Sequence, residues 1–356
     1  MTYRCPLTGQ SLYAYSPKGP KARAIGFAEA AADGLLLTED GTVGYPVRDG
    51  IPHLAVEYAV GAALPGSAVD QERHDEINEE IEIYDRLASR DRVAIEKAAV
   101  RLFGETLTVA VREGRNLGRF PEPLSLWVDS VGSADTQFVA YDHLAPLDGT
   151  TFLQLGGSGS HAIKALLAGA RSAGLLSPSF EEVRLGRALA DYLGVADRFF
   201  GVVGIGELVP LSDACLDRVY GGGCLHHTEI QHSVPELGRL IRPGGKAGFV
   251  DPQENPVYSS WSHLLGRVRF CGDEEGTHDH PLDTAELRAL AEPRFREVEI
   301  YASGGLARYA VVLAARTVGV APSVQNAARL FRAERKVLDT LKLGVLYGNM
   351  AVMLER

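Results

Sequence analysis

The sequence predicts an α/β protein built around a doubly wound sheet, preceded by a small β-rich module and a helical cap. From residue 151 onward, short apolar runs alternate with segments of helical spacing, which is the pattern of parallel βαβ units. The first of these runs, TFLQL, ends in the glycine-rich stretch GGSGS, as expected for a tight turn from a strand into a helix. Residues 1–57 lack this alternation and contain short strands and turns instead.

Composition narrows the classes of function. The chain has 356 residues, with 36 Lys plus Arg against 46 Asp plus Glu and a net charge of −10, whereas proteins that bind a nucleic-acid backbone need concentrated positive charge. No apolar run is long enough for a membrane-spanning helix, and the first residues lack the apolar core of a secretory signal. The four cysteines are scattered, as is usual in a reducing cytosol. We expect a cytoplasmic protein that binds neither nucleic acid nor a membrane.

The first two segments differ in texture. Within residues 1–57, two short apolar runs flank Asp40-Gly41, which is a hairpin signal. Residues 58–146 are expected to form a helical cap or linker, because residues 69–99 combine many charges with apolar residues at helical spacing. A further helix is expected within residues 124–144, after a loop at 114–123.

Residues 147–356 are expected to form the α/β domain. The predicted strands are residues 151–155, 172–176, 199–203, 217–220, 246–250, 297–301 and 350–354. The predicted helices are residues 161–170, 180–193, 234–241, 306–318 and 323–341, and residues 243–245 are expected to form a turn. The last two helices, within residues 306–341, form an insertion before the final strand. They are rich in apolar residues, so they could form a homodimer surface, an apolar substrate pocket or ordinary packing.

The segment from Thr151 to Pro252 resembles the class I S-adenosylmethionine-dependent methyltransferases. The likeness is strongest in LSDACLDRVYGGGCLHHTEIQHSVPELGRLIRPGGKAGFVDP, with an Asp before the fourth strand, Leu-His-His after it, a helix, and Arg-Pro-Gly-Gly before the fifth strand. THDHPL, residues 277–282, and Glu286-Leu287 are similar to the segment before the family's last helix and sixth strand. The resemblance covers roughly residues 147–301, with residues 350–354 as an antiparallel seventh strand. It implies a seven-stranded Rossmann-like methyltransferase sheet and S-adenosylmethionine as the cofactor.

A second resemblance concerns the N-terminal module. YPVRDGIPHL, residues 45–54, is similar to the end of the small zinc-ribbon protein that activates several tRNA and translation-factor methyltransferases. That ribbon usually carries paired cysteines, whereas Cys5 has no CxxC partner here, and a tetrahedral zinc site needs about four N or S ligands. We therefore expect a ribbon-like module without metal, with a structural role or a role in covering the active site.

The methyltransferase resemblance implies a cofactor loop after the first strand, and this chain departs from the family there. Gln154 stands at the family's acidic position, and Ser158 and Ser160 replace two usual glycines. The remaining glycines would let the backbone approach the methionine part of the cofactor, and the following helix offers free N–H groups.

Two further acids of the family are missing. Leu175 or Leu176 stands where the strand-two acid would accept the ribose hydroxyls, and Ile205 stands where an Asp would meet the adenine, with Glu207 as a candidate substitute. Each lost hydrogen bond to a charged group costs roughly 1.5–3 kcal/mol. Other groups must then compensate, or the cofactor differs, or the site has lost it. The cofactor-binding residues expected on this basis are Tyr84, Gln154, Gly156, Gly157, Ser158, Gly159, Ser160, Leu175, Ser177, Ile205, Gly206, Glu207 and Gly223.

Histidines supply the candidate chemistry. His226 and His227 follow the predicted fourth strand, at the sheet edge where doubly wound folds bind ligands, and either could act as a general base or merely cap the next helix. His278 and His280 flank Asp279 in the segment that the resemblance places near the substrate. This cluster could bind a metal, but a helix entry with Asp283 or Thr284 as the N-cap is the simpler interpretation. The catalytic candidates are therefore His226, His227, His278 and His280, and no metal site is expected.

Three hypotheses follow. The first is an S-adenosylmethionine-dependent enzyme that methylates oxygen or nitrogen of a small, partly apolar molecule, with His227 as the base. The second is a methyltransferase-like protein with a degenerate cofactor site, acting as a non-methylating enzyme or a binding partner; the replaced acids favour it. The third is a methyltransferase of tRNA or protein, which only the N-terminal resemblance suggests and which, for tRNA, the net charge of −10 opposes.

Overall fold

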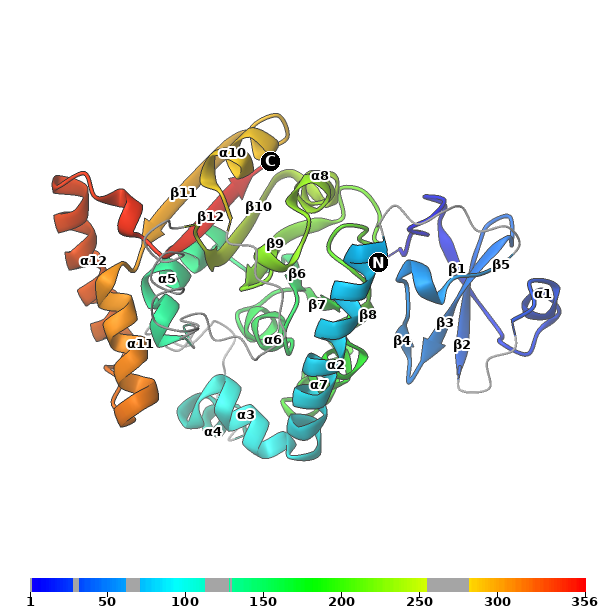
Figure 1. Cartoon of the computed structure of the whole chain (residues 1–356). Coiled ribbons are helices and arrows are strands. Elements are labelled where there is room, and N and C mark those ends of the chain that lie inside the picture. Colours follow the sequence, from blue (N-terminus) through cyan, green and yellow to red (C-terminus); the bar gives the residue numbers. More distant parts are fainter. Residues whose placement is uncertain (1, 28–31, 62–70, 113–127, 129, 255–281) are drawn as a thin grey trace.

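A computed structural model describes residues 2–27, 32–61, 71–112, 128, 130–254 and 282–356 (Figure 1). Its larger sheet has seven strands in the order β11-β12-β10-β9-β6-β7-β8. These strands are β6 (Thr151–Leu155), β7 (Ser172–Ser177), β8 (Phe199–Val203), β9 (Leu216–Gly222), β10 (Ile241–Pro252), β11 (Glu297–Ser303) and β12 (Asn349–Glu355). β12 runs antiparallel to both of its neighbours, and the pairs from β10 to β8 are parallel. The predicted methyltransferase-type sheet with an antiparallel seventh strand is confirmed.

Helices cover both faces of this sheet. One face packs against α5 (Ala134–Leu144), α6 (Ser160–Leu167) and α7 (Phe180–Tyr192), and the other against α8 (Ile230–Leu240) and α10 (Thr284–Ala291). Neighbouring residues of a strand therefore enter different cores, since side chains alternate along a strand. The short 3₁₀ helices are η1 (Val56–Tyr58), η3 (Val131–Ser133), η4 (Ala196–Arg198), η5 (Leu225–His227) and η6 (Gly344–Leu346).

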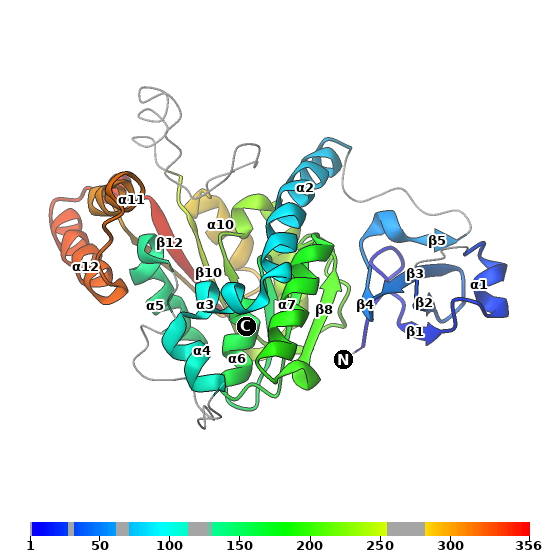
Figure 2. The ribbon, with the colours of Figure 1, turned by 90° about the horizontal axis from the view of Figure 1, so that it is seen from below.

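The N-terminal module is a separate antiparallel sheet beside the edge strand β8 (Figures 1 and 2). It comprises β1 (Leu12–Tyr15), β2 (Gly34–Thr38), β3 (Val43–Arg48), β4 (Ile51–Pro52) and β5 (Val60–Gly61), with the short helix α1 (Pro20–Ala24). The predicted hairpin around Asp40-Gly41 joins β2 to β3. The Leu54 N–H donates to the carbonyl of Val203 at 2.8 Å, so the module covers an edge that would otherwise be open to pairing.

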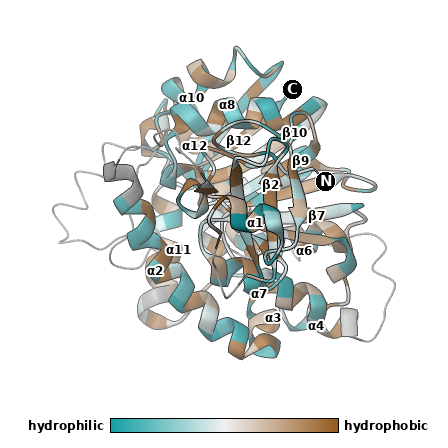
Figure 3. Ribbon diagram, turned by 90° about the vertical axis from the view of Figure 1, so that its right-hand side faces the viewer, coloured by the Kyte–Doolittle hydropathy of each residue, from teal (hydrophilic) through white to brown (hydrophobic). Residues whose placement is uncertain are grey.

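The helical cap consists of α2 (Gln71–Val93), α3 (Ile95–Phe103) and α4 (Glu105–Arg112). Hydrophilic and hydrophobic residues alternate along α2 (Figure 3), as predicted for an amphipathic helix. This helix packs on α7 and lies over the carboxyl edge of the sheet (Figure 2).

The insertion before the last strand is a helical hairpin of α11 (Leu306–Val318) and α12 (Val324–Thr340), at the opposite end of the molecule from the N-terminal module (Figure 1). α12 packs on α5 through a buried face that includes Phe331 and Leu338. Other large apolar side chains of the hairpin are exposed, among them Leu330 and Val337.

Some local predictions differ from the structure. Residues 243–245 were expected as a turn, but they lie within β10, whose register against β9 shifts between Ile241 and Lys246. α1, β1 and α4 had no counterpart in the prediction, because short or strongly charged segments carry little periodic signal. The expected N-cap Asp283 is confirmed, since its carboxylate accepts the N–H groups of Ala285 and Glu286. No helix in the part of the chain described above is both long and apolar enough to cross a membrane.

Gly174 lies directly opposite Phe200 in the β7–β8 pair, and a Cβ at Gly174 would come within 2.1 Å of a Phe200 ring carbon. We expect Gly174→Ala to lower the free energy of unfolding by about 1–3 kcal/mol, because it overpacks the sheet. Urea denaturation measures the change. The control is the same substitution in a Phe200→Leu background, where the loss should be much smaller; an equal loss there would mean that the ring is not the cause.

Candidate functional site

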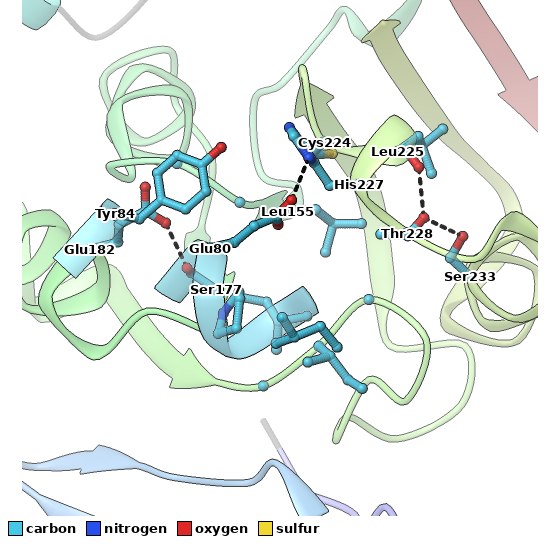
Figure 4. Close-up of a pocket in the computed structure, with 18 of the residues that line it drawn as sticks. Glu80, Tyr84, Leu155, Ser177, Glu182, Cys224, Leu225, His227, Thr228 and Ser233 are labelled. Carbon is cyan, nitrogen blue, oxygen red and sulfur yellow. Dashed lines mark hydrogen bonds and ion pairs between the residues drawn. The ribbon is translucent and has the colours of Figure 1, made fainter. Parts of the chain in front are cut away.

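A cavity of about 220 Å³ lies at the carboxyl ends of β6 to β9 and is roofed by α2 (Figure 4). Ligands of doubly wound sheets bind at this edge. The predicted site residues that line it are Tyr84, Gly156, Gly157, Ser177, Ile205, Gly206, Glu207, Gly223 and His227. The predicted residues that do not line it are Gln154, Ser158, Gly159, Ser160, Leu175 and His226.

The glycine-rich loop forms one wall of the cavity. Gly156 and Gly157 have φ values of +67° and +75°, a left-handed conformation that favours glycine. A Cβ at Gly159, where φ is +81°, would lie 3.0 Å from the Cα of Gly186. This third glycine therefore allows the loop to approach α7 and has no place in the cavity wall. Ser160 is buried as the first residue of α6.

Gln154 holds this loop from behind. Its side chain is 2% exposed; Nε2 donates to the carbonyl of Gly156 at 2.8 Å, and Oε1 accepts the N–H of Ala162 at 2.9 Å. The amide thus ties the loop to the first turn of α6 and satisfies a helix N–H that has no intrahelical partner. Gln154 is a positioning residue, not a ligand contact as we expected.

Leu175, at the end of β7, does not line the cavity as we expected. Leu175 is fully buried in the core that α6 and α7 cover, whereas Leu176 faces the other side of the sheet and lines the cavity. Ser177 follows and also lines the cavity. Because Leu175 faces away from the cavity, a carboxylate at that position would be buried in an apolar core and would not meet a ribose.

Glu182 is a cavity residue that the sequence analysis missed. Ser177 Oγ donates to Glu182 Oε2 at 2.6 Å (Figure 4). Burial is the main cause that raises the pKa of Glu182 to about 7; the nearby carboxyl of Asp85 acts in the same direction, and the hydrogen bond from Ser177 acts against it. The cavity therefore contains a carboxyl group that titrates near neutral pH.

The segment after β8 supplies three more predicted residues. Ile205, Gly206 and Glu207 all line the cavity, and Glu207 is 3% exposed. Its Oε1 accepts the N–H of Glu229, at the start of α8, at 3.1 Å. A negative charge is favourable at a helix N-terminus, so Glu207 supports α8 as well as the cavity.

Two imidazoles lie side by side after β9, and each is paired with a carboxylate. His227 Nδ1 lies 3.0 Å from Glu80 Oε1 on α2 (Figure 4), and His226 Nδ1 lies 2.9 Å from Asp251 Oδ1 at the end of β10. The ring centroids of the two histidines are 4.0 Å apart. Only His227 lines the cavity, whereas His226 and Asp251 are buried behind it. His226 is therefore placed to support His227, not to meet a substrate as we expected.

Tyr84 and Cys224 complete the wall near His227. The Tyr84 ring meets the His227 ring edge-on, with centroids 6.5 Å apart. Burial raises the pKa of the Cys224 thiol well above its ordinary value. Cys224 is therefore a neutral thiol and not an activated nucleophile.

Three further candidates, His278, Asp279 and His280, lie outside the described residues. Within the described ranges, no group of three or more His, Cys, Asp or Glu side chains could hold a metal ion. Cys5, Cys215 and Cys224 are free thiols.

The two hydrogen bonds of the Gln154 side chain should contribute to the stability of the protein. We expect Gln154→Met to lower the free energy of unfolding by about 1–3 kcal/mol, because it leaves the Ala162 N–H and the Gly156 carbonyl without their partner. Gln154→Glu keeps the acceptor for Ala162 and should lose less. Chemical denaturation compares the two variants, and equal losses would contradict the role given to Oε1.

Three curated relatives match part of the chain, and no family model matches it. The relatives are uncharacterized methyltransferases from Mycobacterium bovis and from two strains of Mycobacterium tuberculosis. Each is 30% identical over 81 residues, which is 23% of this chain and 30% of the relative. The chain therefore matches less than a third of the length of these relatives.

Solved structures are similar in fold at low sequence identity. Geranyl diphosphate C-methyltransferase from Streptomyces coelicolor, in complex with Mg²⁺, geranyl diphosphate and S-adenosyl-L-homocysteine, has a TM-score of 0.45 at 15% identity and covers 63% of this chain and 79% of its own. A putative sarcosine dimethylglycine methyltransferase from Galdieria sulphuraria has a TM-score of 0.44 at 16% identity, covering 68% and 94%. The [4+2]-cyclase SpnF has a TM-score of 0.42 at 17% identity, covering 62% and 78%.

Proposed function

We propose that this protein is an S-adenosylmethionine-dependent methyltransferase that acts on a small molecule. The observation that carries the proposal is the cavity itself, which combines the glycine loop after β6, the ends of β7 and β8, and an imidazole after β9 at one edge of a methyltransferase-type sheet. The 81-residue match to curated methyltransferases supports it.

The residues present fit such a cofactor. Gly156 and Gly157 present backbone in the cavity wall, where a ligand can approach it closely. A Cβ at Gly156 would lie 3.3 Å from the Cβ of Cys224, another residue of that wall. Ser177, Glu182 and Glu207 offer oxygens in the wall, and Tyr84 closes the cavity from α2. When bound, S-adenosylmethionine supplies an electrophilic methyl group on sulfur for in-line displacement. The protein then contributes mainly proximity and orientation.

His227 is the proposed base. Its Nδ1 faces Glu80 at 3.0 Å, and a carboxylate at Nδ1 favours the tautomer with the proton on that nitrogen. Nε2 is then the nitrogen able to accept a proton from a hydroxyl or amine. The acceptor would lose its proton to His227 as its oxygen or nitrogen bonds to the methyl carbon, while the bond between that carbon and sulfur breaks and S-adenosylhomocysteine leaves.

A second candidate function keeps the cavity but not the methyl transfer. Gln154 stands at the position of a family acid, and both polar atoms of its amide are hydrogen-bonded to the protein backbone. This favours a site adapted to another ligand. Binding of S-adenosylmethionine and of its demethylated product, S-adenosylhomocysteine, separates the two functions.

We expect the wild-type protein to bind S-adenosylhomocysteine in isothermal titration calorimetry, and Gly156→Val to weaken that binding at least tenfold, because two methyl groups would enter the space that the ligand needs. The matched control is Gly194→Val after α7. Gly194 has a similar φ of +71° and no heavy atom within 4 Å of a Cβ. The Gly194→Val variant should therefore have the same backbone strain but keep its affinity for S-adenosylhomocysteine.

Absence of heat with either nucleoside in the wild type would overturn the methyltransferase proposal. Equal losses in the two glycine variants would instead remove the loop from the binding site.

We also propose that α11 and α12 form a contact between two copies of the chain. Leu330 and Val337 lie on one exposed stripe of α12, 45% and 56% exposed, with the exposed small residue Ala333 between them. In an antiparallel pair of α12 helices, each Leu330 would meet the partner's Val337 across the small Ala333, which gives the self-complementary surface that a two-fold dimer needs.

Leu330→Glu with Val337→Glu should abolish this contact, because it places like charges opposite each other. We expect analytical ultracentrifugation to find a dimer for the wild type and a monomer for the double variant. Val93→Glu on α2, an apolar position that is 83% exposed and lies away from the hairpin, is the control and should stay dimeric. A wild-type monomer at all concentrations would contradict the proposal.

A further inference from the structure

Glu182 brings a carboxyl group to the cavity from helix α7, not from the end of a strand. The family resemblance implies a ribose-binding acid at the end of the second strand of the sheet, β7, but this strand ends in Leu176 and Ser177. Glu182 lies five residues beyond Ser177, in the first turn of α7. Its side chain returns to the strand end, where it meets Ser177 Oγ at 2.6 Å (Figure 4).

Hydrogen bonds at the start of α7 hold the Glu182 side chain in this position. Ser179 caps α7, because its Oγ accepts the N–H of Glu182 at 3.1 Å. Ser179 is fully buried and also bonds to Asp85 on α2. The start of α7 is therefore held from both sides, and Glu182 is 9% exposed.

The hydrogen bonds leave room for a ligand. A carboxylate has about four lone-pair sites on its two oxygens. Ser177 Oγ uses one site on Oε2, which leaves the two sites of Oε1 to a ligand of the cavity that Glu182 lines. Two remaining acceptor sites match the two neighbouring hydroxyl groups of a ribose.

We infer that Glu182 replaces the strand-end acid and accepts the ribose hydroxyls of a nucleoside ligand in this cavity. This inference rests on the proposed function, since it assumes that the ligand is S-adenosylmethionine or its product. Glu182 also explains how the chain tolerates Leu176 and Ser177 at the strand end.

The charges around Glu182 make the contact depend on pH. Asp85 and Tyr84 face this region from α2 and His227 faces it from η5, whereas Ser177 is a neutral donor. Burial and Asp85 raise the pKa of Glu182 to about 7. The ionised carboxylate is the stronger acceptor, so affinity for the nucleoside should rise as the pH increases from 6 to 8.

The test compares S-adenosylhomocysteine with its 2′-deoxy analogue by calorimetry at pH 8. In the wild type, removal of the 2′-hydroxyl should weaken binding roughly 10- to 100-fold. In Glu182→Gln, S-adenosylhomocysteine itself should bind roughly 10-fold more weakly or worse, and the penalty for the missing hydroxyl should fall to a few-fold. The wild-type gain in affinity between pH 6 and pH 8 should also disappear.

Glu181→Gln is the matched control, because this neighbour on α7 pairs with Arg92 and Arg184 outside the cavity. It should keep both the hydroxyl penalty and the pH dependence. Should Glu182→Gln fail to fold, Glu182→Asp draws the carboxyl back by one methylene and should reduce the penalty in the same way.

An unchanged hydroxyl penalty in the folded Glu182 variant would overturn the inference while leaving the proposed function standing. No binding of S-adenosylhomocysteine to the wild type would instead overturn the proposed function, so the two failures are distinguishable.

Discussion

The sheet of this protein is buried on both faces, and this constraint decides where its chemistry lies. Leu153 and Phe152, like Leu176 and Leu175, enter opposite apolar cores. A polar group in the middle of such a strand would lose its water without gaining a partner. Polar side chains therefore concentrate where strands end, and the carboxyl ends of four neighbouring strands enclose the cavity.

The same alternation explains which predictions from the sequence were right. The strands and helices after residue 151 follow from apolar periodicity, and the structure places nearly all of them within a few residues of the prediction. The prediction that Leu175 lies at the cofactor site was wrong for a related reason: a shift of one residue along a strand moves a side chain to the other face of the sheet. The periodic signal identified the strand but not the residue at its end that reaches the ligand.

Two residues of the site could not be found from local patterns. Glu182 looks like any acidic residue in the first turn of a helix, where negative charge is common. Glu80 reaches His227 across 147 positions of the sequence, and no spacing rule connects such a pair. Both depend on how α2 lies across α7: one face of α2 brings Ile77, Glu80 and Tyr84 to the cavity. The cap is thus part of the site, although its sequence shows only amphipathic spacing.

The contact between the N-terminal module and β8 has a consequence for how the chain is made. His53 pairs with Val203 in a parallel bridge, so the module docks on residues that follow it by about 150 positions in the sequence. At synthesis rates of about 5–20 residues per second, that interval is on the order of 10–30 s. The module is synthesised before β8, so its small sheet must either be stable alone or remain unfolded until the strand edge that it covers has been translated.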